Sequence, residues 1–137
     1  MFKLNFATPD KKVVAGEELE EITVPAFRGE LNILPGHAPL MTTLEAGIVR
    51  YRLKSGETRK MAIGWGYCQI SPEAVNVLAE SAMAGGEIDL EVVSRKLKAE
   101  EEKLATESLD DKGWERANLE IGRLRAEAAL AKQAKAH

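Results

Sequence analysis

The sequence is poor in the residue types on which most catalytic and metal sites depend. Its 137 residues include one cysteine, Cys68, and two histidines, His37 and His137. A single cysteine cannot form an internal disulfide, and no cluster of cysteine and histidine has the spacing of a zinc site. We therefore expect no bound metal, no resident cofactor and a reducing environment.

The sequence also lacks features that would indicate other functions. With 19 basic and 22 acidic residues, the net charge is −3, which argues against a general nucleic-acid binder because such proteins displace counterions with excess positive charge. No apolar run reaches the roughly 20 residues of a membrane span, and the first residues alternate in polarity, so no secretory signal is expected. Phosphate-binding glycine loops and a nucleophile elbow are missing too, so we do not expect an enzyme.

Proline is absent after Pro72, and this absence helps to divide the sequence in two near Gly85–Gly86. In the first part, apolar and polar residues alternate in short segments separated by turns, as in Phe2–Phe6 and Val49–Leu53. Alternation is typical of strands with one buried face. Short strands with turns at this spacing are typical of an antiparallel β-sandwich or barrel. We expect residues 1–85 to form such a domain.

From Ile88 onward, apolar residues are spaced three and four apart, as on one face of a helix. Two such stripes are present: Leu90, Val93, Leu97, Glu100 and Leu104, then Ala117, Ile121, Leu124, Ala128 and Ala131. Residues 108–113 are expected to form a loop that also supplies an N-cap oxygen to the second helix. Residues 86–137 are thus predicted to form an antiparallel helical hairpin.

The two halves of this hairpin differ in charge. Residues 86–115 contain five basic and ten acidic side chains, whereas residues 116–137 contain five basic and two acidic ones. One interpretation is that the charges match the helix dipoles and keep the surface solvated. The other is that the basic second helix binds an acidic partner, for which complementary charge sets encounter rate and specificity. The residues alone leave both interpretations open.

We interpret as structural three residues of types that often take part in catalysis or cofactor binding. Cys68 is interpreted as a small buried strand residue instead of a reactive thiol. Trp65 and Trp114 are interpreted as packing residues instead of platforms for a cofactor. A small sandwich without a catalytic constellation favours a docking module over an enzyme.

One segment stands apart, Gly29 to Leu44, which reads GELNILPGHAPLMTTL. Its two prolines push the preceding residues, Leu34 and Ala38, into extended conformations, so the segment is expected to be stiff. Because stiffness lowers the ordering cost of binding, a contact surface is one interpretation. The other is a corner of the sandwich in which His37 is hydrogen-bonded locally.

This segment strongly resembles the motif G-E-x-G-x-L-P-G-H-A-P-L-x-T-x-L of the epsilon subunits of F-type ATP synthases. The resemblance covers essentially the whole chain, because a strand-rich first part, a glycine break and a charged two-helix C-terminus recur in that family. Asn32 departs from the motif, which usually has glycine there. Since asparagine tolerates a positive φ better than other non-glycine residues, we expect the turn to survive.

The resemblance implies a non-catalytic subunit of the central rotor, whose sandwich binds the γ subunit and the membrane c-ring. Proton-driven rotation of the ring would reach the catalytic α and β subunits through γ. Carried over by position, Glu30 matches a residue near the c-ring loops. His37, Ala38 and Thr42 match the loop that faces γ.

The hairpin resembles the regulatory element of the family, which can extend beside γ into the catalytic head and inhibit ATP hydrolysis. By this resemblance, the hairpin arginines are expected to contact acidic segments of the catalytic α and β subunits. These arginines are Arg116, Arg123 and Arg125.

Some family members also bind ATP on this hairpin as a sensor. Asp89 and Arg123 match two residues of that site, but Val92 and Glu127 stand where arginines are expected. Neither a valine nor a carboxylate can replace a phosphate-binding guanidinium. We therefore expect ATP sensing to be weak or absent.

A free-standing adaptor, in which the sandwich carries a helical protein-binding arm, is the alternative from another functional class. Under the family interpretation, a subunit without a targeting peptide or a membrane span is expected at the cytoplasmic face of a bacterial inner membrane. It would be a peripheral protein there, held only by its complex.

Overall fold

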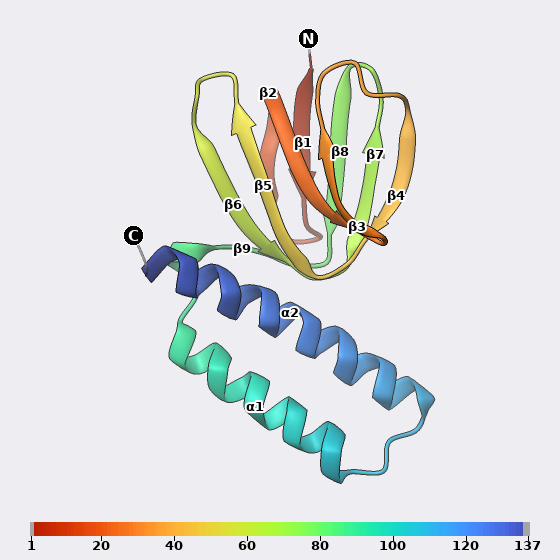
Figure 1. Ribbon diagram of the computed structural model, residues 1–137, viewed down its shortest axis with the longest axis vertical. Helices are drawn as coiled ribbons and strands as arrows, with labels where there is room; N and C mark the ends of the chain where they lie inside the picture. The colour runs from red at the N-terminus through yellow and green to blue at the C-terminus, as the bar shows by residue number, and fades with distance from the viewer. Residues whose placement is uncertain (1, 136–137) are drawn as a thin grey trace.

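The computed structural model describes residues 2–135, so His137 lies outside the described residues. Nine strands precede two helices along the chain (Figure 1). The elements are β1 (Lys3–Ala7), β2 (Lys12–Ala26), β3 (Gly29–Ile33), β4 (Leu40–Leu44), β5 (Gly47–Leu53), β6 (Thr58–Ile63), β7 (Gly66–Ile70), β8 (Ala74–Ala79), β9 (Ala82–Ala84), a 3₁₀ turn η1 (Gly85–Glu87), α1 (Leu90–Thr106) and α2 (Asp111–Lys135). The predicted fold class, a β-sandwich followed by a helical hairpin, is confirmed.

The strands form one hydrogen-bonded sheet that folds over into two layers (Figure 1). Their order is β1-β8-β7-β4-β2-β5-β6-β9, with β3 beside β2. The 15-residue strand β2 pairs with β1 in its first half and with β3 and β5 in its second half, so it connects the layers. The pairings of the described strands are antiparallel, as expected, except that β1 and β8 run parallel.

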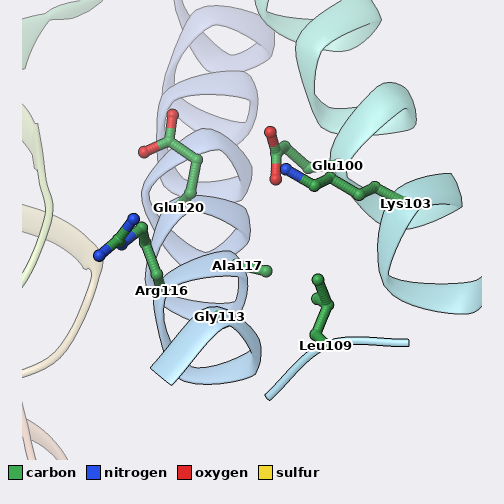
Figure 2. A pocket seen from close by; sticks show the side chains of 7 residues that line it. All are labelled: Glu100, Lys103, Leu109, Gly113, Arg116, Ala117 and Glu120. Carbon is green, nitrogen blue, oxygen red and sulfur yellow. The ribbon is translucent and has the colours of Figure 1, made fainter. Parts of the chain in front are cut away.

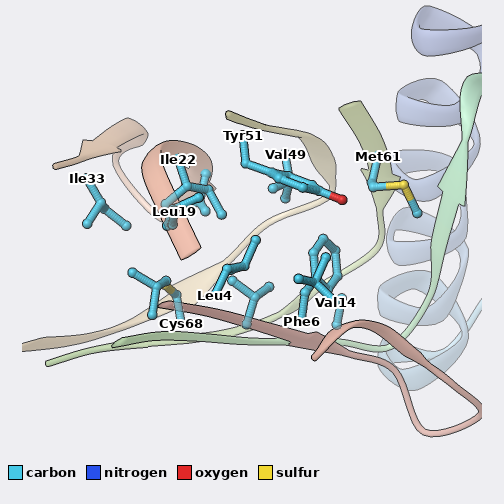
Figure 3. Packing of buried hydrophobic residues seen from close by; sticks show 14 of the residues in the cluster. Leu4, Phe6, Val14, Leu19, Ile22, Ile33, Val49, Tyr51, Met61 and Cys68 are labelled. Atoms are coloured by element: carbon cyan, nitrogen blue, oxygen red, sulfur yellow. The ribbon is translucent and has the colours of Figure 1, made fainter. Parts of the chain in front are cut away.

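The alternation read from the sequence produces the core between the two layers (Figure 3). Leu4 and Phe6 of β1 are buried, whereas Asn5 between them is exposed. The rings of Phe6 and Tyr51 meet edge to face, with centroids 6.4 Å apart. Every buried member of this core cluster precedes Gly85, so the sandwich has a hydrophobic core of its own.

The two helices form the predicted hairpin, but the loop between them is shorter than expected. The prediction placed residues 108–113 in a loop, whereas α2 begins at Asp111. The Asp110 carboxylate accepts a hydrogen bond from the Gly113 N–H at 2.8 Å. Because this side chain satisfies the helix terminus early, Gly113 lies inside the first turn of α2.

Helix α2 lies between the sandwich and α1 (Figure 1). One side of α2 packs on the outer surface of β5 and β6, which we call the covered face. This contact consists of small and aliphatic residues, namely Ala126 and Leu130 of the helix and Ala62 and Ile48 of the strands. Another side packs on α1, where Leu124 and Ala128 of the predicted stripe contact Val93. The hairpin is therefore docked on the sandwich in this structure.

Candidate functional site

The outer surface of the other layer carries no helix and almost no charge. We call it the open face, formed by the outward side chains of β1, β8, β7 and β4. These side chains are Lys3, Asn5, Ala7, Ala74, Asn76, Leu78, Tyr67, Gln69, Met41 and Thr43. Lys3 alone among these ten is charged, and it lies at one end of the surface, where it pairs with Ala74. Exposed apolar side chains that lie together on one surface often mark an interaction site.

The strand register places the largest side chains of the open face next to one another. Tyr67 lies opposite Thr43 on one side and opposite Leu78 on the other. Met41, Tyr67 and Leu78 are 67, 51 and 56% exposed. Exposed aromatic and apolar side chains among amides are the composition of protein–protein interfaces. The open face is therefore the strongest docking candidate on the sandwich.

Beneath the open face, Cys68 of β7 is fully buried. Burial raises the pKa of its thiol to about 12, so the reactive thiolate is scarce at neutral pH. This confirms its interpretation as a buried strand residue. Within residues 2–135, no group of three or more His, Cys, Asp and Glu side chains is arranged to hold a metal ion.

The stiff segment forms a tight turn at the corner between β3 and β4. The His37 N–H donates to the Leu34 carbonyl at 3.2 Å, and Gly36 between them has φ 86°, which glycine adopts without strain. The His37 Nδ1 lies 2.8 Å from the Ala38 carbonyl oxygen. The corner interpretation thus describes the backbone, while Leu34 and Ala38 remain exposed at its surface.

Asn32 does not adopt the positive φ that was expected for it. It lies within β3, and the described residues with positive φ are all glycines. Its side-chain amide donates to Thr23 Oγ1 of β2 at 2.9 Å. The prediction was wrong because this position belongs to a strand, where asparagine joins β3 to β2 and needs no left-handed turn.

The three residues matched to the γ-facing loop do not lie together on one surface. His37 and Ala38 lie at the corner, whereas Thr42 points to the side of β4 opposite to Met41 of the open face. Thr42 lines a hollow that also contains Phe27 and Glu30. The structure therefore brings Thr42 together with Glu30, although the resemblance assigned them to different partners.

Glu30 lies on β3 and forms an ion pair with Arg50 of β5 at 2.8 Å. Both side chains are about half exposed. The same two residues border a groove whose far wall is α2, including Gly122 and Arg125. Glu30 therefore lies between the corner hollow and the docked hairpin.

The three hairpin arginines have different surroundings on α2. Arg116 is exposed and borders a pocket that Glu100 and Lys103 of α1 also line, but its guanidinium points away from α1 (Figure 2). Arg125 pairs across the hairpin with Glu101 at 3.4 Å. The third, Arg123, is mostly covered and pairs along its own helix, so the docked hairpin already uses two of the three.

Glu127 is the only buried charged side chain among the described residues, with 3% of its surface exposed. Its carboxylate accepts a hydrogen bond from Arg123 Nη1 at 2.7 Å, and Arg123 also pairs with Glu120. Burial raises the pKa of Glu127, and the attraction of the Arg123 guanidinium opposes that rise only in part. The docked hairpin therefore contains a desolvated carboxylate held by one partner.

The residues matched to the ATP-sensing pattern are occupied by contacts within the chain. Asp89 caps α1, because its Oδ1 accepts hydrogen bonds from the N–H groups of Glu91 and Val92 at 3.1 and 3.3 Å. The Arg123 guanidinium is engaged by Glu120 and Glu127. A nucleotide bound at Asp89 and Arg123 would have to displace Glu120 and Glu127 from the Arg123 guanidinium.

Sequence reasoning missed the open face and misread the two tryptophans. Trp65 and Trp114 are 44 and 57% exposed, so their interpretation as packing residues was wrong. One pattern in the sequence could have indicated the open face. Tyr67 and Gln69 alternate with buried Cys68, which places an aromatic residue on the outward side of a strand. That signal identifies a large exposed side chain but not its neighbours on other strands.

Comparison with known proteins gives consistent matches. The family model of the ATP synthase delta/epsilon chain β-sandwich domain matches residues 1–85. The ATP synthase epsilon chain of Bdellovibrio bacteriovorus is 47% identical over 132 residues, which cover 96% of this chain and 94% of the relative. The ATP synthase epsilon chain of Geotalea uraniireducens is 40% identical over 129 residues, covering 93% and 92%.

Two solved structures share the fold. A chain of the Euglena gracilis mitochondrial ATP synthase superposes with a TM-score of 0.79 at 20% identity, covering 99% of this chain and 81% of the other. A chain from the central stalk and c-ring of the Tetrahymena thermophila mitochondrial ATP synthase gives 0.62 at 16% identity, covering 97% and 95%. For the part of the chain that is described, neither helix combines the length and the apolar character needed to cross a bilayer.

Proposed function

The chain belongs to the ATP synthase epsilon-chain family, and from that premise we propose that it is a rotor subunit of a bacterial F-type ATP synthase. In this proposal the subunit binds γ and the c-ring, carries no catalytic step itself, and couples proton-driven rotation to synthesis in the α and β subunits. It lies at the cytoplasmic face of the inner membrane as a peripheral member of the complex. Family membership favours this role over a free-standing adaptor.

The single observation that carries the proposal is the open face, which we assign to γ. Its exposed aromatic and apolar side chains, centred on Tyr67 and Leu78, lie on a rigid sheet with its own core. A preformed surface loses little conformational entropy on binding, which suits a contact that must transmit torque. His37 and Ala38 at the corner then lie at the border of this contact instead of at its centre.

We assign the corner hollow around Glu30 to the polar loops of the c-ring. The exposed Glu30 carboxylate and the exposed Phe27 side chain border this hollow, which is open to solvent. Reversing the charge in Glu30→Lys should weaken coupling between rotor and ring, measured as ATP-driven proton pumping by the reconstituted complex. Glu57→Lys is a matched control, because Glu57 pairs with Arg59 at the same 2.8 Å distance elsewhere on the sandwich. Equal pumping by Glu30→Lys and the unmodified complex would count against this assignment.

The hairpin serves in this proposal as a mobile brake on ATP hydrolysis. The docked hairpin is the inactive position, in which Arg123 and Arg125 pair with carboxylates of the hairpin itself. Extension along γ would separate Arg125 from Glu101 and present the arginines to the catalytic subunits. Replacing Arg116, Arg123 and Arg125 together by alanine should relieve inhibition, whereas replacing Lys96, Lys98 and Lys103 of α1 should not. Full inhibition by the triple arginine variant would remove this role.

The experiment that tests the whole proposal is hydrolysis by the α/β/γ head, titrated with the full chain and with a chain ending at Gly86. The shorter chain retains the core cluster, and circular dichroism and thermal melting would verify its fold. Binding by both chains with inhibition by the full chain alone supports the rotor subunit and the brake. Binding by neither chain would refute the proposal.

ATP should not be an effector of this hairpin, because the groups at Asp89 and Arg123 are already paired. Isothermal titration of the full chain with ATP is expected to give no heat of binding below millimolar concentrations. Sub-millimolar binding would show that the internal pairs yield to the nucleotide.

A further inference from the structure

Trp65 is held in a rigid backbone and yet faces solvent. It lies between Gly64 and Gly66, which are both buried. A Cβ on Gly66 would collide with the Leu78 carbonyl oxygen, so β7 and β8 approach as closely as they do only because this residue is glycine. The Trp65 carbonyl accepts a hydrogen bond from the Glu80 N–H at 2.9 Å. The chain thus fixes the position of a large side chain that it leaves 44% exposed.

Trp65 extends the open face toward the hairpin. Its ring meets the ring of Tyr67 edge to face, with centroids 6.2 Å apart and planes at 88°. Tyr67 in turn lies opposite Leu78 in the centre of the open face. Leu78, Tyr67 and Trp65 therefore form one uninterrupted apolar strip.

On its other side, Trp65 shares a hollow with α2. The hollow has a volume of about 410 Å³, and its walls come from the β4–β5 turn and from one side of the helix. The lining residues are Leu44, Glu45, Ala46, Trp65, Asn118, Leu119 and Gly122. A Cβ on Gly122 would come within 3.2 Å of the Ala46 Cβ, so the helix is seated closely against the turn. The hollow exists as a two-sided groove only because α2 is docked there.

The helix side of the hollow continues the apolar strip. Leu119 is 48% exposed although it borders the hollow. Trp114 lies one turn before Asn118, which donates a side-chain hydrogen bond to the Trp114 carbonyl at 2.9 Å. Among the side chains that line the hollow, Glu45 alone carries a charge. Exposed tryptophan and leucine beside a hollow are the kind of anchor that dominates protein interfaces.

We propose that the open face, Trp65 and Leu119 form one composite docking surface, complete only while the hairpin is docked, and that γ occupies all of it. This inference rests on the proposed function, since it extends the γ contact from the sheet onto α2. The occupant follows from continuity, because an apolar segment of γ that covers Tyr67 and Leu78 reaches Trp65 next and then Leu119.

The composite surface has a consequence for regulation. The contact that γ makes with Leu119 and Trp65 together forms only in the docked position, so this contact favours docking, and docking strengthens this contact by the same factor. Release of the hairpin from its docked position would therefore lose the part of the γ contact on α2 and keep the part on the open face. The sandwich would stay attached to γ as the hairpin leaves.

The test compares three full-length variants for binding to the α/β/γ head. Leu119→Asp places a charge in the hollow, Tyr67→Asp places one in the open face, and Val92→Asp is the matched control on an exposed site of α1. We expect Leu119→Asp to weaken binding about tenfold, Tyr67→Asp to weaken it at least a hundredfold, and Val92→Asp to leave it unchanged. Circular dichroism checks that each variant keeps its helices.

The outcomes separate this inference from the function on which it rests. Loss of binding by Tyr67→Asp with no change in Leu119→Asp would overturn the composite surface and leave the open face as the γ site. Equal weakening by Leu119→Asp and Val92→Asp would also overturn it, because the effect would then come from added charge alone. If Tyr67→Asp binds as tightly as the unmodified chain, the proposed γ site itself fails. Supporting evidence would be slower hydrogen exchange in residues 114–122 than in α1 when the head is bound.

Discussion

The covered face and the open face belong to the same sandwich but are built from different side chains. The covered face meets its helix through small and aliphatic residues, with Ala62 and Ile48 in one cluster with Ala126 and Leu130. The open face presents large side chains, among them Tyr67 and Met41, and no helix lies on it. Burial of a methylene contributes about 0.8 kcal/mol, whereas an aromatic anchor at an interface contributes about 2 kcal/mol or more.

Because of this difference, we expect the contact on the covered face to be easily reversed and a contact on the open face to be lasting. A helix held by a small apolar cluster, which includes Ala126 and Leu130, can be released at modest cost, as the proposed mobile hairpin requires. An uncharged surface with aromatic anchors is unfavourable in water and becomes favourable when a partner covers it. In the proposed function, the sandwich therefore combines a weaker contact with its own hairpin and a stronger contact with γ.

The largest effect is expected on the open face, from the substitution Tyr67→Asp. A desolvated charge in the centre of an apolar interface should weaken γ binding at least a hundredfold, about 2.7 kcal/mol or more. Surface plasmon resonance with the α/β/γ head measures it. Ser55→Asp, in the exposed turn between β5 and β6, is the control and should bind normally. Normal binding by Tyr67→Asp would show that the open face does not contact γ.

The next effect is expected on the covered face, where Ala126→Arg places a long side chain against Ala62. Overpacking costs about 1–3 kcal/mol, so the undocked population should rise roughly five- to 150-fold while the melting of the sandwich stays the same. Fluorescence energy transfer between labels on β2 and α2 measures docking. Ala99→Arg on the exposed side of α1 should leave docking unchanged. Unchanged docking of Ala126→Arg would mean that the contact with Ala62 does not hold the hairpin.

A smaller effect is expected from pH, through Glu127. Burial raises the pKa of this carboxyl in the docked hairpin, so the docked state binds a proton more readily than the open state. The resulting stabilisation of docking is complete below the ordinary pKa of 4.5 and is lost as the pH rises through the docked-state pKa. Glu127→Gln should flatten this dependence in the same energy-transfer assay. If docking of the Glu127→Gln variant still depends on pH, another group is responsible for that dependence.

The smallest effect is expected at the ion pair between Glu30 and Arg50, which lies between the corner hollow and α2. Exposed ion pairs contribute at most about 1 kcal/mol, so Arg50→Gln should lower the melting temperature of the chain by a few degrees at most. Differential scanning calorimetry at low and high salt measures the change, and salt should remove it. A loss that salt does not reduce would show that Arg50 stabilises the fold by packing instead of charge.

Much of the architecture could be predicted because it depends on local periodicity. The alternation around Leu4 and Phe6 gave a buried strand, and the stripe through Leu124 and Ala128 gave a helix face, as the structure confirms. Predictions from local patterns failed where a contact with another residue determined the secondary structure. Gly113 seemed to belong to a loop, but the Asp110 cap draws it into α2.

The candidate site was harder to predict than the fold. The motif from Gly29 to Leu44 contains β4, but Thr42 and Met41 point to opposite sides of that strand. The open face combines residues from strands that are far apart in sequence, such as Asn5 and Asn76, whose side chains are hydrogen-bonded at 3.0 Å. A single sequence contains no direct signal for such a meeting.

The sequence by itself determined the division into strands and helices, the buried side of the alternating strands and the family, because side-chain periodicity and a long motif are properties of the chain alone. Only the tertiary structure decided which surface stays open, where Trp65 points and that Glu127 is buried beside Arg123. The physical reason is that exposure depends on which distant segments pack together. Helix α2 covers one end of β5 and β6, whereas neither described helix covers the open face (Figure 1).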